Sequence, residues 1–219
     1  MNTMSNAPQN AFVHYIGPSP VTSFQPKSMY PAIDPTVFVG PFSSVIGDVT
    51  IKPHVFIAPH ASIRADEGSP FYIGERASLQ DGVILHGLYD ERVEVKGRHY
   101  SIYIDRDVSI THGAIVHGPA YIGERSFVGF QSLVFQAIVG SNVYISSNAV
   151  VTGHIVVDSH RFVPPGAVID TQQKADELPP IPRNADEFAA AVRAVNREFT
   201  SSYTLLFGNR RCSCGLACS

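Results

Sequence analysis

An aliphatic residue recurs at every sixth position through most of this chain, and that period limits the possible folds more than any other feature. A period of six fits neither a helix nor a long amphipathic strand. It fits hexapeptide repeats, in which a short strand and a turn form one face of a triangular coil. An ordinary β-sandwich of short strands is the alternative, but nothing in that fold explains why the six-residue period keeps its phase over so many repeats. The repeated positions are Val39, Val45, Ile51, Ile57, Ile63, Ile73, Leu79, Leu85, Ile104, Ile110, Val116, Ile122, Val128, Val134, Val139, Ile145, Val151, Val157, Val163 and Ile169.

The predicted coil has three faces, and stacked coils pair as parallel strands about 4.8 Å apart. We therefore predict an all-β fold, a parallel β-helix. The spacing does not give its hand, but the resemblance to hexapeptide-repeat proteins implies a left-handed β-helix. The period divides the chain into an N-terminal arm over residues 1–30, a β-helix domain over 31–178, a linker and C-terminal helix over 179–208, and a cysteine-containing tail over 209–219.

The segment after the β-helix predicts an amphipathic helix that lies along the solenoid wall. Asn184 is its predicted N-cap, with Glu187 three residues on, and Gly208 its predicted terminator. Its apolar positions at helical spacing are Phe188, Val192, Val195, Phe199 and Tyr203.

Composition excludes several classes of function. Hydrophobic residues make up 44% of the 219 residues, enough to fill a core, and the formal net charge is −3. No basic excess indicates a nucleic-acid or membrane partner. No apolar run approaches the roughly 20 residues that span a bilayer, and the N-terminus lacks the apolar centre of a secretory signal. We expect a soluble, cytoplasmic protein.

Most of the nine histidines are expected at the surface or in turns, and the repeat register singles out three. Counting three faces per coil places Val116 directly above Leu85. His86 and His117 each follow one of these aliphatic residues, so they should stack on one wall, one coil apart. Arg64 continues the same column one coil below.

His112 falls on a different face, which it shares with Gln80. One triangular prism does not bring two faces to one metal, but two neighbouring prisms do, and repeating that contact closes a three-fold ring. Three imidazoles with an open fourth position are the arrangement of a catalytic zinc site. Iron or cobalt could use the same ligands.

Three segments of this chain resemble the signature stretches of the γ-class carbonic anhydrases. The resemblance covers roughly residues 35–175 and implies that His86, His112 and His117 hold Zn²⁺ at the subunit interfaces of a homotrimer, where CO₂ is reversibly hydrated to bicarbonate. The segments are residues 62–68, 80–86 and 112–119.

The same resemblance implies roles for five further residues. Arg64 and Asp66 would support the subunit contact and the order of the site. Gln80 would orient the attacking oxygen, and Glu67 would take its proton. Asn196, in the predicted helix, matches a family asparagine near the substrate pocket.

Two departures bear on function. The loop after the first histidine, residues 87–93, is shorter than in the archetypal family, and Arg92 offsets its acidic charge, which puts proton export by that route in doubt. The arm, helix and tail together resemble the front domain of carboxysome assembly proteins. That resemblance implies a carboxysomal location and partners among other carboxysome proteins, namely shell proteins, and Rubisco through C-terminal repeats that are absent here.

All three cysteines lie in the tail. A second zinc site there would lack a fourth ligand. A disulfide between Cys212 and Cys214 would close a very tight ring, so we favour Cys212 with Cys218, through a turn at Gly215. Such a disulfide would pin the helix end and control activity by oxidation.

Three functions compete at this point. The chain is a zinc-dependent carbonic anhydrase, or an assembly module of the carboxysome with a weak or silent metal site, or a hexapeptide acyltransferase. The third shares the solenoid but typically needs one catalytic histidine and a cofactor groove. The first two can coexist in one protein.

Overall fold

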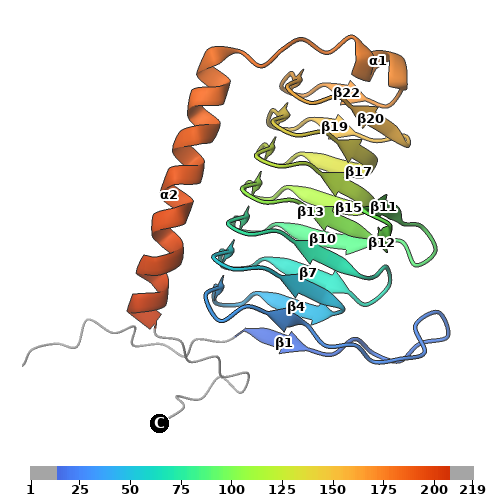
Figure 1. The fold of residues 1–219 in the computed structure, drawn as a ribbon, viewed down its shortest axis with the longest axis vertical. Helices are drawn as coiled ribbons and strands as arrows, with labels where there is room; N and C mark the ends of the chain where they lie inside the picture. The colour runs from blue at the N-terminus through green and yellow to red at the C-terminus, as the bar shows by residue number, and fades with distance from the viewer. Residues whose placement is uncertain (1–13, 208–219) are drawn as a thin grey trace, which may run out of the picture.

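The computed structural model describes residues 14–207, which form a triangular β-solenoid with a long helix along one side (Figure 1). Parallel strands build three walls, named here faces A, B and C. Face A holds β1 (Tyr15–Gly17), β4 (Ser44–Gly47), β7 (Ser62–Ala65), β10 (Ile84–Gly87), the first parts of β15 (Ile115–Ile122) and β17 (Leu133–Val139), β19 (Val150–Val151) and β22 (Val168–Ile169).

The other two faces complete each coil. Because β15 and β17 continue round the corner, faces A and B belong to one sheet, while face C is separate. Face B holds β2 (Ala32–Ile33), β5 (Val49–Ile51), β8 (Phe71–Ile73), β13 (Ile102–Ile104), the second parts of β15 and β17, and β20 (Ile155–Val157). Face C holds β3 (Phe38–Val39), β6 (Phe56–Ile57), β9 (Ser78–Leu79), β14 (Ser109–Ile110), β16 (Phe127–Val128), β18 (Tyr144–Ile145) and β21 (Phe162–Val163).

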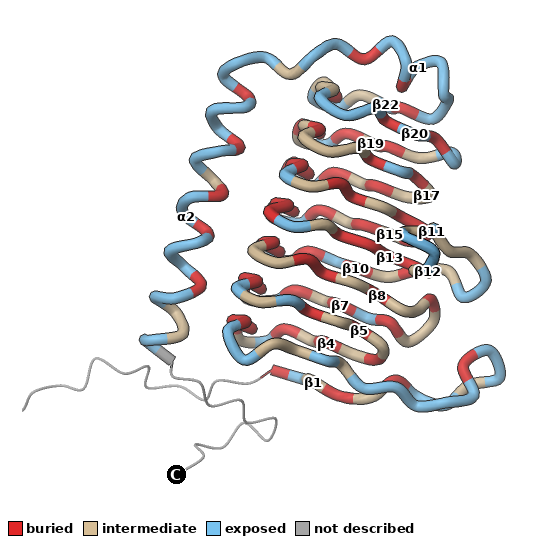
Figure 2. Tube along the Cα trace, viewed as in Figure 1, coloured by how far each residue is buried: buried red, intermediate tan, exposed pale blue. Residues whose placement is uncertain are grey.

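The predicted parallel β-helix is confirmed, and so is its register. Every aliphatic residue of the six-residue repeat is buried inside the prism, as the alternating colours of the strands in Figure 2 show. Leu85 pairs with Ile63 on one side and with Val116 on the other. The excursion after His86 adds no wall, because it is an antiparallel hairpin of β11 (Val93–Val95) and β12 (Arg98–Tyr100).

Four of the nine histidines occupy corner positions of the coil with left-handed backbone. Their φ values lie between 55° and 65°, a region that histidine tolerates better than most residues. This is the turn role that the sequence predicts for most of them. They are His54, His60, His154 and His160.

The last coil is closed by a short helix, α1 (Gln172–Asp176), whose N-cap is Thr171. The side-chain amide of Gln172 accepts from Val156 N–H at 2.9 Å and donates to Val156 O at 2.8 Å. These are the two bonds that a further strand would make with β20. A side chain therefore takes the place of the next coil at this edge.

The predicted helix is α2 (Arg183–Phe207), and it lies along face C (Figure 1). Aromatic contacts join Phe188 to Phe127 and Tyr203 to Phe38. The N-cap prediction is wrong, because the first helical hydrogen bonds close on the carbonyl of Pro182 and place Asn184 inside the first turn.

The predicted apolar stripe of α2 is only partly right. Phe188, Val195 and Phe199 are each more than 40% exposed, although Phe188 and Phe199 contact aromatic rings of face C. The buried residues of α2 are small or polar, because α2 stands close to the polar turns between faces B and C. The buried positions are Ala185, Ala189, Arg193, Asn196 and Thr200. No helix among residues 14–207 is long and apolar enough to cross a membrane.

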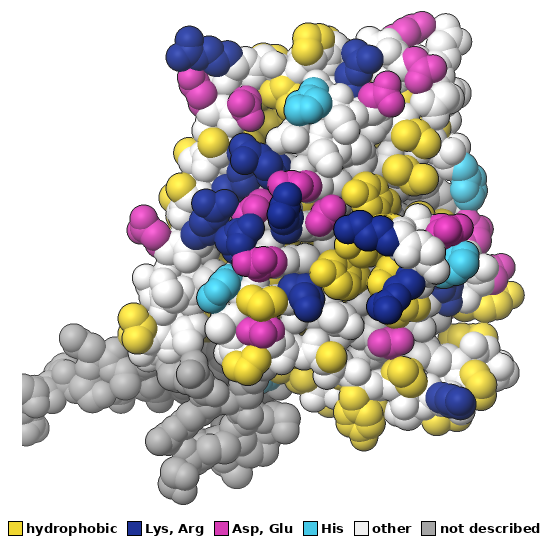
Figure 3. Space-filling model, in the orientation of Figure 1, with side chains coloured by type: hydrophobic (Ala, Val, Ile, Leu, Met, Phe, Trp, Pro, Cys, Tyr) yellow, Lys and Arg dark blue, Asp and Glu magenta, His cyan; other side chains and the backbone are white. Residues whose placement is uncertain are grey.

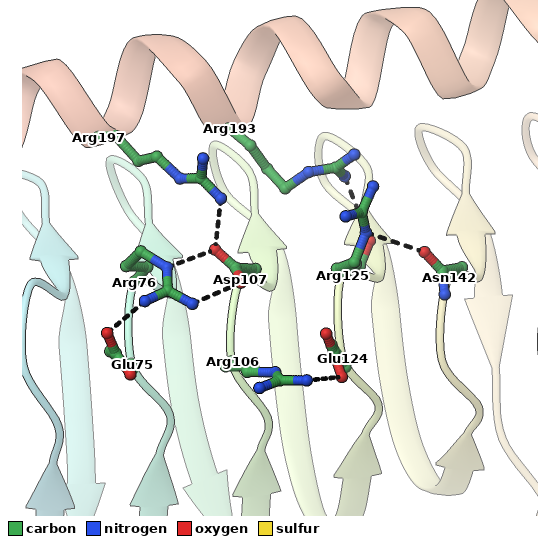
Figure 4. Close-up of polar contacts among 9 residues, drawn as sticks. All are labelled: Glu75, Arg76, Arg106, Asp107, Glu124, Arg125, Asn142, Arg193 and Arg197. Carbon is green, nitrogen blue, oxygen red and sulfur yellow. Dashed lines mark hydrogen bonds and ion pairs between the residues drawn. The ribbon is translucent and has the colours of Figure 1, made fainter.

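Charged side chains gather along the junction between α2 and these turns (Figures 3 and 4). The Asp107 carboxylate accepts two hydrogen bonds from Arg76, both at 2.9 Å, and one from Arg197 of α2 at 2.8 Å. Burial raises the pKa of Asp107, but the bonds and charges of the two arginines outweigh burial and leave the pKa below its ordinary value.

Asp107→Asn is therefore expected to lower the free energy of unfolding by about 1–3 kcal/mol, because both arginines lose a charged acceptor. The lowered pKa means that this stability is present above the ordinary pKa of an aspartate and is lost as the pH falls through the pKa of the folded protein. Denaturant unfolding at several pH values and hydrogen exchange of α2 would measure both effects. Arg106→Gln is the control, since its pair with Glu124 is exposed and should matter little. Equal losses in the two variants would contradict this prediction.

Candidate metal centre

His86 and His117 lie side by side on face A, at paired positions of β10 and β15. Their nearest ring nitrogens, Nδ1 of His86 and Nε2 of His117, are 3.3 Å apart, and the ring centroids are separated by 5.2 Å. The two imidazoles are partly buried. The predicted stacking of these two histidines is thus confirmed, and it presents two nitrogen donors on one wall.

Carboxylates of the neighbouring coil surround His86. Its Nε2 atom lies 3.3 Å from Asp66 Oδ1 and 3.7 Å from Glu67 Oε2. Arg64 Nε donates to the other oxygen of Asp66 at 3.0 Å. His86 Nε2 and Asp66 Oδ1 are both buried, and their mutual contact is the geometry of an ion pair and not of a hydrogen bond. A buried imidazole nitrogen that no hydrogen bond occupies can still serve as a metal ligand.

The ring of His117 is oriented from two sides. Its Nδ1 atom is 3.1 Å from the carbonyl oxygen of Gly118, and Phe135 packs edge-on against it. A proton on Nδ1 donates to that carbonyl and leaves the lone pair of Nε2 directed toward His86. This is the usual outer contact of a metal-binding histidine.

His112 stands on the turn between faces C and A, at another edge of the prism. Its Nδ1 atom is 3.0 Å from Asp81 Oδ2, and its ring stacks on Phe130. More than half of its side chain is exposed. Gln80, next to Asp81, is buried.

One chain does not complete a metal site. Within residues 14–207, no three His, Cys, Asp or Glu side chains are grouped so that they could hold a metal ion. His86 and His117 are brought together and His112 is not. The donor set fits zinc only if a second copy brings its His112 edge to this wall.

Asn196 is not brought to the histidine pair within the chain. It is buried on α2, and its side-chain nitrogen donates to Val192 O at 2.9 Å. Cys212, Cys214 and Cys218 lie outside the described residues, as does Gly208.

The loop after His86 holds contacts that the sequence did not predict. Gln136 Nε2 lies 3.2 Å from both carboxylate oxygens of Glu91. Arg92 donates to the carbonyls of Leu88 and Glu91 rather than to a carboxylate. Burial lowers its pKa, and Asp90 opposes that shift. A cavity of about 470 Å³ opens beside this loop. Gln136 is far away in sequence, and no motif marks it.

The chain is similar to known proteins in two groups. It is 41% identical over 181 residues to the carbonic anhydrase of Methanosarcina thermophila, which covers 78% of this chain and 72% of that protein. It is 42% identical over 172 residues to the carboxysome assembly protein CcmM of a Nostoc species, which covers 78% of this chain and 31% of that protein. The chain thus spans less than a third of that CcmM relative. No family model matches.

Solved structures bear on the fold alone. A hexapeptide transferase family protein from Anaplasma phagocytophilum superposes with a TM-score of 0.64 over 90% of this chain and 99% of that one, at 19% identity. A UDP-N-acetylglucosamine acyltransferase gives 0.51 over 72% and 57%, at 16% identity.

The solenoid and its paired imidazoles define a hexapeptide-repeat protein with a candidate metal-binding site on face A. The identity with the Methanosarcina enzyme over most of both chains then decides the family. This chain belongs to the γ-class carbonic anhydrase family, close to the N-terminal domain of CcmM.

Proposed function

We propose that the chain is a zinc-dependent carbonic anhydrase, which converts CO₂ and water reversibly to bicarbonate and a proton at the three subunit interfaces of a homotrimer. The observation that carries this proposal is the His86–His117 pair on face A, in which a buried nitrogen of His86 makes no hydrogen bond among residues 14–207, together with His112 on a different edge. Family membership supports the same reaction.

In this proposal His86 and His117 of one copy and His112 of the next hold the metal. A bound zinc ion would lower the pKa of its water toward about 7 and so supply a nucleophile at neutral pH. Gly118 O orients His117, and the Asp81 carboxylate orients His112.

The remaining polar residues handle the water and its proton. Glu67, whose carboxylate is about one third exposed, accepts the proton and passes it to solvent. Gln80 orients the attacking oxygen. Arg64 fixes the Asp66 carboxylate beside His86, and Asn196 would act only through a copy whose α2 reaches the pocket.

A second candidate function is assembly within the carboxysome. It is favoured by the CcmM relatives, which are named carboxysome assembly proteins and share 40–44% identity with this chain. In this role the trimer would bind other carboxysome proteins, with or without activity. Shell proteins are the proposed partners, and contact with Rubisco would be made by C-terminal repeats and not by the solenoid.

Oxidation of the tail is the proposed control. A Cys212–Cys218 disulfide, directly after α2, would pin the end of that helix and favour the active trimer. The proposal is supported by the position of α2, which is fastened to the solenoid through Arg197 and Asp107.

One experiment tests the function, the interface and the control together. Zinc content, CO₂ hydration and light scattering would be measured on one sample, with and without reductant, for wild type and Cys218→Ser. We expect a trimer with one zinc per chain, and an activity that falls with reductant in wild type only. A monomer that keeps its zinc would refute the interfacial site. A zinc-free, inactive trimer would favour the assembly role. An activity that does not change with reductant would contradict control by the disulfide.

A further inference from the structure

Ser101 is a fully buried residue at the corner between faces A and B. Its N–H donates to Pro70 O and its carbonyl accepts from Ala120 N–H, both at 2.9 Å. Its Oγ atom has no hydrogen-bond partner among residues 14–207. A buried hydroxyl without a partner is unfavourable compared with a methyl group, so packing alone would favour alanine here.

Three glycines enclose this hydroxyl, and each follows a residue of the candidate metal centre. Gly68 follows Glu67, Gly87 follows His86, and Gly118 follows His117. A Cβ atom on any of the three would lie within 3.0 Å of Ser101 Oγ, closer than real Cβ contacts. None of the three has a positive φ, so the need for glycine here is one of space and not of backbone conformation.

The three glycines also connect the segments of the site to one another. Gly68 N–H donates to Gly87 O at 2.9 Å, and Leu88 N–H donates to Gly118 O at 3.3 Å. Gly118 O is also the oxygen that faces Nδ1 of His117. The spacing of these three backbones therefore sets where His86, His117 and the Glu67 segment stand.

We propose that Ser101 is a positioning residue for the metal ligands. Its hydroxymethyl group fills the space between Gly68, Gly87 and Gly118, and it thereby fixes the distance between the two backbone segments that carry His86 and His117. This inference rests on the proposed zinc site. It concerns the spacing of the ligands, and Ser101 itself binds no metal.

The test moves the group that fills this space from the backbone segment of Ser101 to that of Gly87. Ser101→Ala leaves the space empty, and Gly87→Ala overfills it, so each is expected to weaken zinc binding about 10–100-fold, the usual effect of disturbing the surroundings of a ligand. In the double variant the new methyl group takes the place of the hydroxyl. Its nearest remaining neighbours are Ser101 Cβ at 3.3 Å and Phe71 Cε1 at 3.5 Å. Zinc affinity should then return to within about threefold of wild type, a coupling that two independent sites would not show.

Two controls distinguish an effect on the spacing of the ligand segments from a general loss of packing in the core. In Gly118→Ala the new Cβ meets the backbone carbonyl of Ser101, which Ser101→Ala leaves in place, so no rescue is expected. Ser109 on face C is equally buried and its Oγ likewise has no partner among the described residues. Ser109→Ala should neither weaken zinc binding nor rescue Gly87→Ala.

The measurements are zinc affinity by competition with a chromophoric chelator, the absorption spectrum of the cobalt-substituted protein, and thermal unfolding. Rescue confined to Gly87→Ala, with a cobalt spectrum restored to that of wild type, supports the inference. No rescue, or equal rescue of Gly118→Ala, overturns it. If Gly87→Ala does not fold, an unchanged affinity and cobalt spectrum in Ser101→Ala alone overturn it. A wild-type protein that binds no zinc overturns both this inference and the proposed function.

Discussion

His112→Ala is expected to abolish zinc binding and CO₂ hydration while leaving the trimer and its solenoid intact. His86→Ala should do the same. The reason is that each variant removes one of the three imidazole donors, and within residues 14–207 no other side chain completes the set. The exposed position of His112 on a turn means that the substitution leaves the core unchanged.

Mixing the two variants distinguishes a shared site from two separate ones. In a ring of three, each interface joins the histidine wall of one chain to the His112 edge of the next. At equal amounts, about one quarter of the interfaces join an intact wall to an intact His112 edge. Mixed and refolded trimers should therefore regain about one quarter of the wild-type zinc and activity. No recovery would contradict a site shared between chains.

Glu67→Gln is expected to lower turnover by about 10²–10⁴-fold in dilute buffer, with zinc content unchanged. Glu67 Oε2 lies 3.7 Å from His86 Nε2, so it is close to the proposed metal ligands without being one of them. The glutamine keeps the shape of the side chain and cannot accept the proton. Stopped-flow hydration assays with increasing imidazole buffer would measure the loss and its rescue.

Glu124→Gln is a matched control, because Glu124 lies on the turns between faces B and C and pairs with Arg106. Its turnover should equal that of wild type. Glu91→Gln tests an acidic side chain of the loop that follows His86, whose carboxylate accepts from Gln136. Unchanged turnover in Glu67→Gln would remove this residue from the mechanism and direct attention to Glu91.

The register of the coil is readable from the sequence because it depends on local spacing. Each inward aliphatic residue fixes its own face, so counting by six places His86 beside His117 before any coordinates are known. The face of α2 was harder to predict. Its partner surface is made of turns, where Arg193 and Asn196 are buried more deeply than Val195.

Two sets of contacts around the site follow no period, and the sequence therefore does not predict them. Ser101 reaches Gly68, Gly87 and Gly118 only because a hairpin excursion returns the chain to the corner between faces A and B. Gln136 meets Glu91 across 45 positions of sequence. Contacts of this kind depend on where loops cross the coils, and no residue pattern records that.

The amide of Gln172 has a consequence for how these molecules behave when crowded. A stack of coils ends in a row of open backbone groups, and such an edge invites the next molecule to add on and grow a filament. Gln172 occupies both groups of Val156, and α1 covers the coil beneath it. Lengthwise growth is thereby blocked at this end. In the proposed trimer, contact runs sideways through the walls, and such contact stops at a closed ring.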